Sequence, residues 1–98
     1  MFDGRLTDEF RRGSCHAGRY ETSLVLADAP GLVDAAVSDL PANEVDMPAA
    51  MAAGRTDFVA MGMDRAYCGA PAEATADEGR ATFDTLADLL VELIEAEA

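Results

Sequence analysis

The sequence has 98 residues, which is enough for one small domain or for a piece of a larger one. It carries 19 acidic residues against 7 basic ones, all of them arginine, and its net charge at pH 7 is −12. Because phosphate recognition needs basic patches, this balance argues against a nucleic-acid partner.

The acidity has three possible causes: disorder, an acidic binding tail, or adaptation to molar salt. Half of the residues are hydrophobic, which disfavours disorder. The acidic residues are spread along the chain instead of forming a block, which disfavours a tail. At molar salt the Debye length is only about 3 Å, so repulsion between carboxylates is screened. The composition therefore favours a halophilic, haloarchaeal-type protein.

No segment indicates a membrane or an export signal. The N-terminal residues lack the apolar core of a signal peptide, and no apolar run approaches the length of a membrane span. We therefore expect a cytoplasmic protein without a membrane partner, whose thiols are reduced. The two cysteines, Cys15 and Cys68, could pair only if the fold brought them close together.

The first half of the sequence predicts short elements. Residues 1–13 have apolar side chains four positions apart, which predicts one or two helical turns. Residues 21–29 predict a helix closed by Pro30, after a loop in which Gly18 is free to take a positive φ. Residues 31–34 predict a turn. Residues 35–40 fit either a short strand or a fraying helix.

The middle of the sequence is less regular. Residues 47–53 predict a short helix, because Pro48 suits a first helical turn and Gly54 follows its end. Residues 57–63 fit a strand or an irregular segment, and residues 67–71 predict a loop. We expect five sulfur-containing side chains to fill the core instead of binding metal: Met47, Met51, Met61, Met63 and Cys68.

The last segment is the clearest helix. Thr75 and Glu78 have the spacing of a capping box, in which each side chain binds the other residue's backbone N–H. Apolar side chains then recur at helical spacing, which predicts a helix over about residues 76–95: Phe83, Leu86, Leu90, Leu93 and Ile94. Gly79 in this helix costs roughly 1 kcal/mol relative to alanine, so we expect it to permit close packing against a neighbour.

Residues 14–23 hold the candidate chemistry. His16 and Glu21 are residue types that transfer protons near neutral pH. They stand five positions apart across a loop-to-helix junction, with Glu21 expected to be buried. This spacing allows both side chains to face one cleft but does not force them to do so.

Plainer interpretations stand beside this one. Most histidines are surface or packing residues, and Glu21 alone would be a partner for the helix dipole. Cys15 is disfavoured as a thiol nucleophile of which His16 is the base, because adjacent side chains often point apart. Arg65 and Tyr67, beside a Gly-Pro loop, fit either a pocket wall or a solvent-facing surface.

Residues 16–24 resemble the signature of the creatininase family, a His-(Gly/Ala)-Gly-x-x-Glu-Thr-Ser motif that opens a helix. Residues 29–34 are similar to the exit from that helix, and residues 69–79 are similar to the start of the family's last helix. The resemblance covers about residues 13–95. It implies that residues 1–98 are a partial domain, the C-terminal part of a family member, with Met1 an internal or misassigned start.

The resemblance implies an α/β fold, namely the C-terminal portion of a three-layer α/β/α arrangement with a mostly parallel sheet, in a homo-oligomer. It implies a metal-dependent hydrolase that cleaves a non-peptide C–N bond in a small amide, such as a cyclic amide or a formamide. His16 would carry the proton to the leaving nitrogen, and Glu21 would orient His16 or shape the pocket. Ser14, Cys15 and Arg19 would contact the substrate.

Full-length family members are expected to bind divalent ions of zinc, manganese or iron through upstream Glu, His and Asp clusters. Those clusters are not in this sequence, so no metal is expected for this chain alone, and its activity as an enzyme is left open. The alternative is a catalytically incomplete remnant or a partner subunit that acts by association, without metal. Stoichiometric metal would distinguish the two. A third interpretation, an unrelated acidic helical module, would require no cleft around His16.

Overall fold

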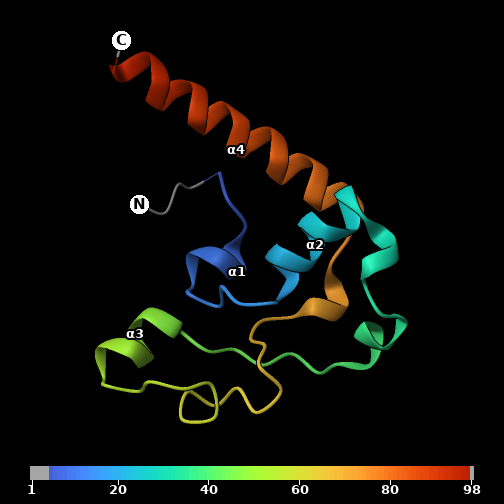
Figure 1. The fold of residues 1–98 in the computed structure, drawn as a ribbon, viewed down its shortest axis with the longest axis vertical. Helices are drawn as coiled ribbons and strands as arrows, with labels where there is room; N and C mark the ends of the chain where they lie inside the picture. Colours follow the sequence, from blue (N-terminus) through green and yellow to red (C-terminus); the bar gives the residue numbers. More distant parts are fainter. Residues whose placement is uncertain (1–4, 98) are drawn as a thin grey trace.

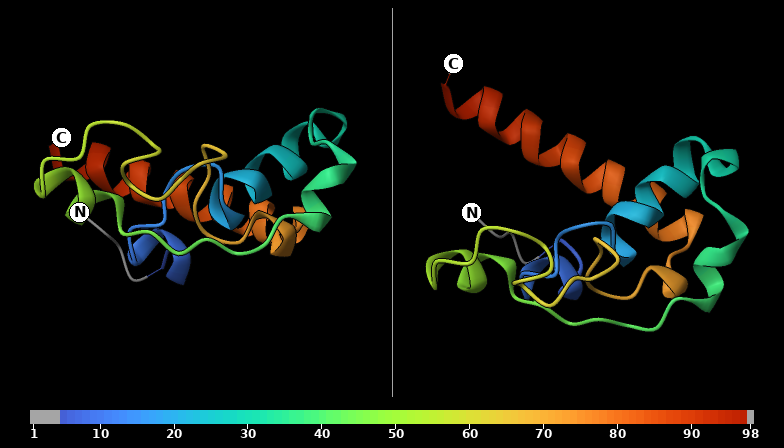
Figure 2. Two further views of the ribbon diagram at one scale, coloured as in Figure 1. Left: turned by 90° about the horizontal axis from the view of Figure 1, so that it is seen from below. Right: turned by 60° about the horizontal axis from the view of Figure 1, so that its bottom comes forward.

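A computed structural model describes residues 5–97, which form helices joined by loops (Figure 1). In chain order the elements are α1 (Asp8–Arg11), α2 (Arg19–Asp28), the 3-10 turns η1 (Pro30–Leu32) and η2 (Ala35–Asp39), α3 (Met47–Ala52), the 3-10 turn η3 (Pro71–Glu73) and α4 (Ala76–Glu97). Helix α4 packs against α2 near its start, and its C-terminal half extends past α2 as an arm (Figures 1 and 2).

The expected α/β fold with a mostly parallel sheet is wrong for residues 5–97. These residues contain no strand, and their only β-type pairing is an isolated antiparallel bridge between Asn43 and Gly69. Residues 35–40 and 57–63, for which a strand was one of two possibilities, are instead bent by local hydrogen bonds. Asp34 accepts a bond from the Ala36 N–H at 2.8 Å, which starts η2, and Asp57 accepts one from the Ala60 N–H at 2.8 Å. Such side-chain bonds compete with strand pairing.

The three helices predicted from periodicity and turn residues are confirmed. Their observed limits in α2, α3 and α4 differ from the predicted ones by no more than two residues at either end. The predicted helical turn near the N-terminus is α1, and the part of that prediction on residues 1–4 lies outside the described residues. Residues 57–63 form irregular turns, and the segment 35–40 contains η2 (Ala35–Asp39) followed by its C-cap residue.

Helix α2 begins without a side-chain cap of its own, because its N-cap residue is Gly18. The cap comes from Glu9 of α1, a buried residue that is only 6% exposed. One Glu9 oxygen accepts a bond from the Tyr20 N–H at 3.0 Å, and the other accepts one from the Ala70 N–H at 2.6 Å. A single buried carboxylate thus joins α1, α2 and the loop before η3, and it also suits the positive end of the α2 dipole.

The start of α4 lies directly on α2. A Cβ built on Gly79 would lie 1.9 Å from the Ser23 carbonyl oxygen, which confirms the expected close packing. The predicted capping box is half formed. The Glu78 N–H donates to the Thr75 hydroxyl at 3.0 Å, but the Thr75 N–H donates to the Ser23 hydroxyl at 3.1 Å, in the place expected for the Glu78 carboxylate.

A small sulfur-rich core is formed by side chains of α3 and of the loop that precedes η3. Met63 and Cys68 are fully buried, and they pack with Ala50 and Met61. These positions confirm the packing role expected of Met61, Met63 and Cys68, with Met47 partly buried against them. Met51 is 52% exposed, so its predicted place in the core is wrong.

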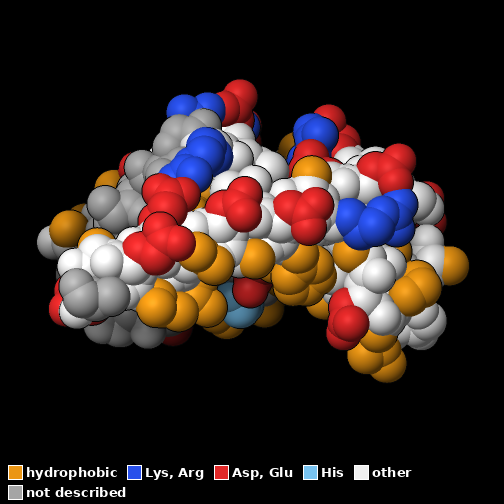
Figure 3. Space-filling view, turned by 90° about the horizontal axis from the view of Figure 1, so that it is seen from above, with side chains coloured by type: hydrophobic (Ala, Val, Ile, Leu, Met, Phe, Trp, Pro, Cys, Tyr) orange, Lys and Arg blue, Asp and Glu red, His pale blue; other side chains and the backbone are white. Residues whose placement is uncertain are grey.

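Over residues 5–97, no helix is both long enough and apolar enough to cross a lipid bilayer. The longest, α4, carries the apolar stripe expected from its sequence but leaves most of it uncovered. Four members of the stripe, namely Phe83, Leu90, Leu93 and Ile94, are 44–65% exposed. Seen from above, acidic side chains follow one side of the molecule and apolar side chains gather along the opposite edge (Figure 3).

We predict that Gly79→Ala lowers the free energy of unfolding by roughly 1–3 kcal/mol, because the new methyl group would overlap the backbone of α2. Helix propensity alone predicts the opposite sign, a gain of about 1 kcal/mol. Urea denaturation at constant salt measures the difference. Gly31→Ala is the matched control, since nothing lies within 4 Å of that position. A stable Gly79→Ala variant would show that α4 does not pack this closely on α2.

Candidate functional site

A groove of about 580 Å³ opens beside the N-terminal half of α2. Most of its wall is apolar and comes from α2, η1, η2 and the loop before η3. Its apolar side chains are Ala17, Val25, Leu32, Val33, Ala36, Val37, Leu40, Ala66 and Pro71, with Tyr67 beside them. Volume and lining are those of a site for a small, largely apolar molecule.

His16 and Glu21 both line this groove. His16 Nδ1 lies 3.9 Å from Glu21 Oε1, and the two side chains are 40% and 48% exposed. The expectation that Glu21 is buried is therefore wrong, although the expectation that both side chains share one cleft is met. The His16 ring stacks on Phe58 with 4.7 Å between ring centroids, which fixes its plane.

The loop that carries His16 is held on both sides. The His16 carbonyl accepts a bond from the Cys68 N–H at 3.0 Å, and Glu21 Oε1 accepts one from the Ala17 N–H at 2.6 Å. Ala17 takes a left-handed conformation with φ of 53°, whereas Gly18 has φ of −92°. The positive φ expected at Gly18 is thus wrong. Gly18 is needed for space, because a Cβ there would lie 2.5 Å from the Glu9 carboxylate.

Ser14 and Cys15 do not line the groove among the described residues. Ser14 is buried, and its hydroxyl donates to the Val45 carbonyl at 2.8 Å and accepts from the Val45 N–H at 3.1 Å. Cys15 Sγ faces Met47 Sδ at 3.9 Å. Burial raises the pKa of the Cys15 thiol, and the nearby Cys68 and Glu21 add to the rise. A neutral thiol is a poor nucleophile, which agrees with the sequence-based argument against that role.

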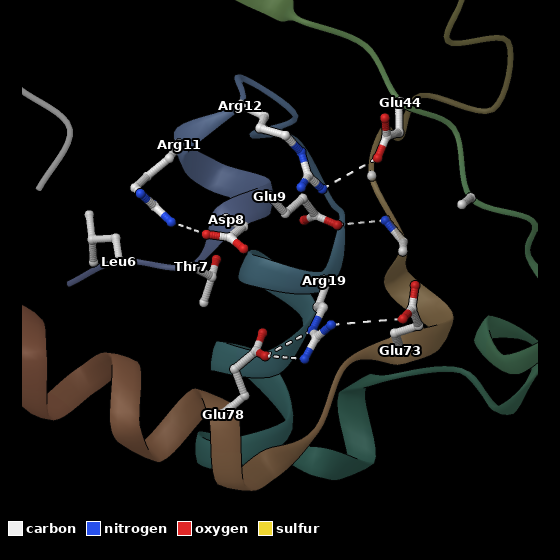
Figure 4. Close-up of a pocket in the computed structure, with 13 residues that line it drawn as sticks. Leu6, Thr7, Asp8, Glu9, Arg11, Arg12, Arg19, Glu44, Glu73 and Glu78 are labelled. Atoms are coloured by element: carbon white, nitrogen blue, oxygen red, sulfur yellow. Dashed lines mark hydrogen bonds and ion pairs between the residues drawn. The ribbon is translucent and has the colours of Figure 1, made fainter. Parts of the chain in front are cut away.

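Arg19 faces a second, charged cavity of about 550 Å³ (Figure 4). Its Nε donates to Glu78 at 2.8 Å, and its Nη1 lies 3.8 Å from Glu73. The hydrogen bond with Glu78 raises the pKa of the Arg19 guanidinium. Residues two apart on a helix do not share a face, so Arg19 and Glu21 point to different cavities. The structure does not bring Arg19 together with His16.

Residues 5–97 do not fit a metal centre. Within this range no group of three or more His, Cys, Asp or Glu side chains could hold a metal ion. In the groove, His16 and Glu21 lie 3.9 Å apart, and Asp34 uses one carboxylate oxygen to start η2. The divalent ions implied by the resemblance would therefore need ligands beyond these residues.

Several groove residues were missed or left open by sequence reasoning. Arg65 and Tyr67, for which pocket and solvent were both open, line the groove. The sequence predicts only a turn and an ambiguous segment where η1 and η2 form the apolar wall. The signal was the run of apolar residues around Leu32 and Val37, but nothing in its spacing shows that it folds back onto α2.

Comparison with known proteins supports the resemblance. The family model described as "Creatininase: Creatinine amidohydrolase" matches residues 2–94, which is most of the chain. A search of the curated proteins and a search of the solved structures each gave no match.

We predict that Cys15 alkylates only under alkaline conditions. In a Cys68→Ser variant, the iodoacetamide rate should rise with pH above the ordinary thiol range around 9.0, because the fold favours the neutral thiol. The same raised pKa stabilises the fold below 9.0 and loses that contribution as pH rises through the folded value. The urea-denatured variant is the control and should react at lower pH. A native thiol that reacts faster than the denatured one would identify an activated nucleophile.

Proposed function

The chain belongs to the creatininase family, and from this membership we propose that it carries the proton-transfer residues and the substrate groove of an amidohydrolase. The family assignment itself indicates an amidohydrolase-type function in general terms. The finer proposal is cleavage of a non-peptide C–N bond in a cyclic amide or a formamide. The observation that carries it is the His16–Glu21 pair at the mouth of an apolar groove.

Amide hydrolysis requires a proton on the leaving nitrogen, because an amide anion is too basic to depart. His16 is positioned to deliver it. Its Nδ1 faces Glu21, which leaves Nε2 for the substrate, in the same arrangement of acid and orienting carboxylate that other hydrolases use. Phe58 holds the ring plane, and the Ala17 N–H holds the Glu21 carboxylate. The apolar wall would offer contact surface to the body of the bound amide.

Members of this family generally use divalent metals. Because residues 5–97 do not fit such a centre, the proposal assigns to this chain only proton transfer and binding of the amide's body. We further propose that residues 1–98 are a partial domain of a cytoplasmic protein that works in molar salt. The support for the salt requirement is the net charge of −12, whose self-repulsion salt would screen.

We predict that His16→Gln lowers kcat/KM by roughly 10²–10⁴, the usual contribution of a general acid. Glu21→Gln should cause a smaller loss, because it orients the imidazole without meeting the substrate. The assay follows ring opening of creatinine to its carboxylate product, and release of the glycine amine and formate from N-formylglycine, in molar KCl with zinc, manganese or iron salts added. Glu73→Gln is the matched control, since Glu73 lines the other cavity and should leave the rate unchanged.

Metal content is measured on the same samples by mass spectrometry. If the wild-type chain hydrolyses neither substrate under these conditions, the enzyme proposal fails for the chain by itself. Equal rates for the wild-type chain and His16→Gln would reject His16 as the proton donor. Only the first result, no hydrolysis by the wild-type chain, would make association the better account.

A second candidate function is association, and the exposed apolar stripe of α4 favours it. The stripe consists of Phe83, Leu86, Leu90, Leu93 and Ile94, and its three most exposed members, Leu90, Leu93 and Ile94, lie in the C-terminal half of α4. Exposed apolar surface of this kind usually marks an interaction site. We propose that a second copy of the chain covers it, so that two α4 helices pack along their stripes.

We predict a dimer in molar KCl that dissociates as the salt is diluted, because each copy carries a charge of −12 and repulsion grows when screening is lost. Light scattering after gel filtration gives the mass. The double substitution Leu90→Gln and Ile94→Gln should yield a monomer at every salt concentration. Val91→Gln, at a 50% exposed position off the stripe, is the control and should remain a dimer. A wild-type monomer in molar KCl would contradict the proposal.

A further inference from the structure

One arginine side chain at the groove, that of Arg65, forms no ion pair with a carboxylate among the described residues. Five of the seven arginines have carboxylate partners: Arg5 with Glu92, Arg11 with Asp8, Arg12 with Glu44, Arg19 with Glu78 and Glu73, and Arg80 with Asp77. Among residues 5–97, the side chains of Arg55 and Arg65 have no ion pair or hydrogen bond. Arg65 lines the groove that holds His16, whereas Arg55 lines a separate, smaller cavity of about 340 Å³.

The carboxylates of the groove do not neutralise Arg65. Glu21 faces His16 and accepts the Ala17 N–H, and Asp34 accepts the Ala36 N–H. In a chain with 19 acidic residues, a guanidinium that stays unpaired beside two engaged carboxylates is not explained by charge balance. It is available to a negatively charged group on a ligand.

The backbone beside Arg65 is strained in the same way as the backbone beside His16. In the described range, Ala17 and Ala66 are the two non-glycine residues with positive φ, at 53° and 61°. Both line the groove, and each directly follows a groove side chain that can carry positive charge. Left-handed alanine is costly and persists only where surrounding contacts impose it, and such residues cluster at ligand sites.

The loop that presents Arg65 is anchored on both sides of that residue. The Ala66 N–H donates to the Met63 carbonyl at 2.9 Å, and Met63 is fully buried. The Tyr67 hydroxyl donates to the Pro41 carbonyl, and the Tyr67 carbonyl accepts a bond from Asn43 at 3.2 Å. The guanidinium therefore projects from a fixed backbone, which lowers the entropy lost when it binds a ligand.

We propose that Arg65 binds a carboxylate of the substrate, so that the groove selects small amides that join an apolar body to a carboxylate. The planar guanidinium can donate two parallel hydrogen bonds to that carboxylate. The apolar body then lies against Val25, Val37 and Leu40. This inference rests on the proposed function, since it names the substrate class of the same groove and places the amide within reach of His16.

The test measures binding and needs no turnover. The ligands are N-acetyl-L-phenylalanine and N-acetyl-L-phenylalaninamide, which differ only in that the carboxylate is replaced by a neutral amide. Each is titrated into the chain while the imidazole signal of His16, the single histidine, is followed by NMR. We expect the carboxylate ligand to shift this signal and to bind about tenfold to a hundredfold more tightly than the neutral ligand, as a charge-assisted contact would give.

Arg65→Gln should remove that preference, and Arg65→Lys should restore part of it, because lysine keeps the charge but not the planar pair of donors. Arg55→Gln is the matched control, since it removes an equally unpaired arginine away from the groove and should leave both affinities unchanged. Thermal midpoints, measured on all variants, should equal that of the wild-type chain, because both arginines are exposed.

Equal binding of the two ligands, no binding of either one, or an equal loss in Arg55→Gln and Arg65→Gln would overturn the inference. The proposed function has separate outcomes. Arg65-dependent binding without any hydrolysis would reject the amidohydrolase proposal and keep this one. Hydrolysis that depends on His16 but is unchanged in Arg65→Gln would keep the amidohydrolase proposal and reject the carboxylate-binding role of Arg65.

Discussion

The carboxylate of Glu9 is the contact on which the arrangement of this chain depends. A buried carboxylate is costly unless its oxygens are hydrogen-bonded, and both oxygens of Glu9 accept backbone N–H groups, from Tyr20 and Ala70. One bond caps the helix that carries Glu21, and the other fixes the chain just after Cys68, which in turn holds the His16 carbonyl. The His16–Glu21 pair, to which we assign proton transfer, therefore has its geometry because a residue outside the motif joins the two segments around it.

The same contact explains the glycines on either side of it. A Cβ at Gly18 would meet a Glu9 oxygen at 2.5 Å, and one at Gly69 would meet the other oxygen at 2.3 Å, where φ is also 82°. Helix α2 then divides its side chains among different tasks. Glu21 faces the apolar groove, Arg19 faces the charged cavity and joins Glu78, and Ser23 supports the start of α4. A single helical motif thus serves the candidate chemistry and holds the last helix.

Surface chemistry and the candidate function are connected through salt. The chain carries many more carboxylates than it can pair, and it leaves part of the α4 stripe uncovered. Repulsion opposes the packing of two such surfaces in dilute buffer, whereas screening at molar salt leaves the apolar contact to dominate. The two proposed functions are compatible for this reason, because a groove at the surface of one copy can operate within an assembly held by α4.

Local chemistry in the sequence determined much of the outcome. Periodicity, proline and cap residues predicted α2, α3 and α4, and the unusual Gly79 correctly indicated close packing. The motif around His16 identified the family and named the pair that lines the groove. These features depend on neighbours a few residues apart, so the sequence contains them directly.

Only the tertiary structure decided how distant parts meet. The sheet expected from the family resemblance is not formed by residues 5–97, because local bonds of Asp34 and Asp57 bend the two segments that could have been strands. The Glu78 side chain binds Arg19 instead of completing the predicted capping box. Arg19 lines the charged cavity instead of the predicted substrate site, and Arg65 lines the groove without an ion pair among the described residues. The positions of Arg19 and Glu78 depend on contacts between residues more than forty positions apart, which no local pattern specifies.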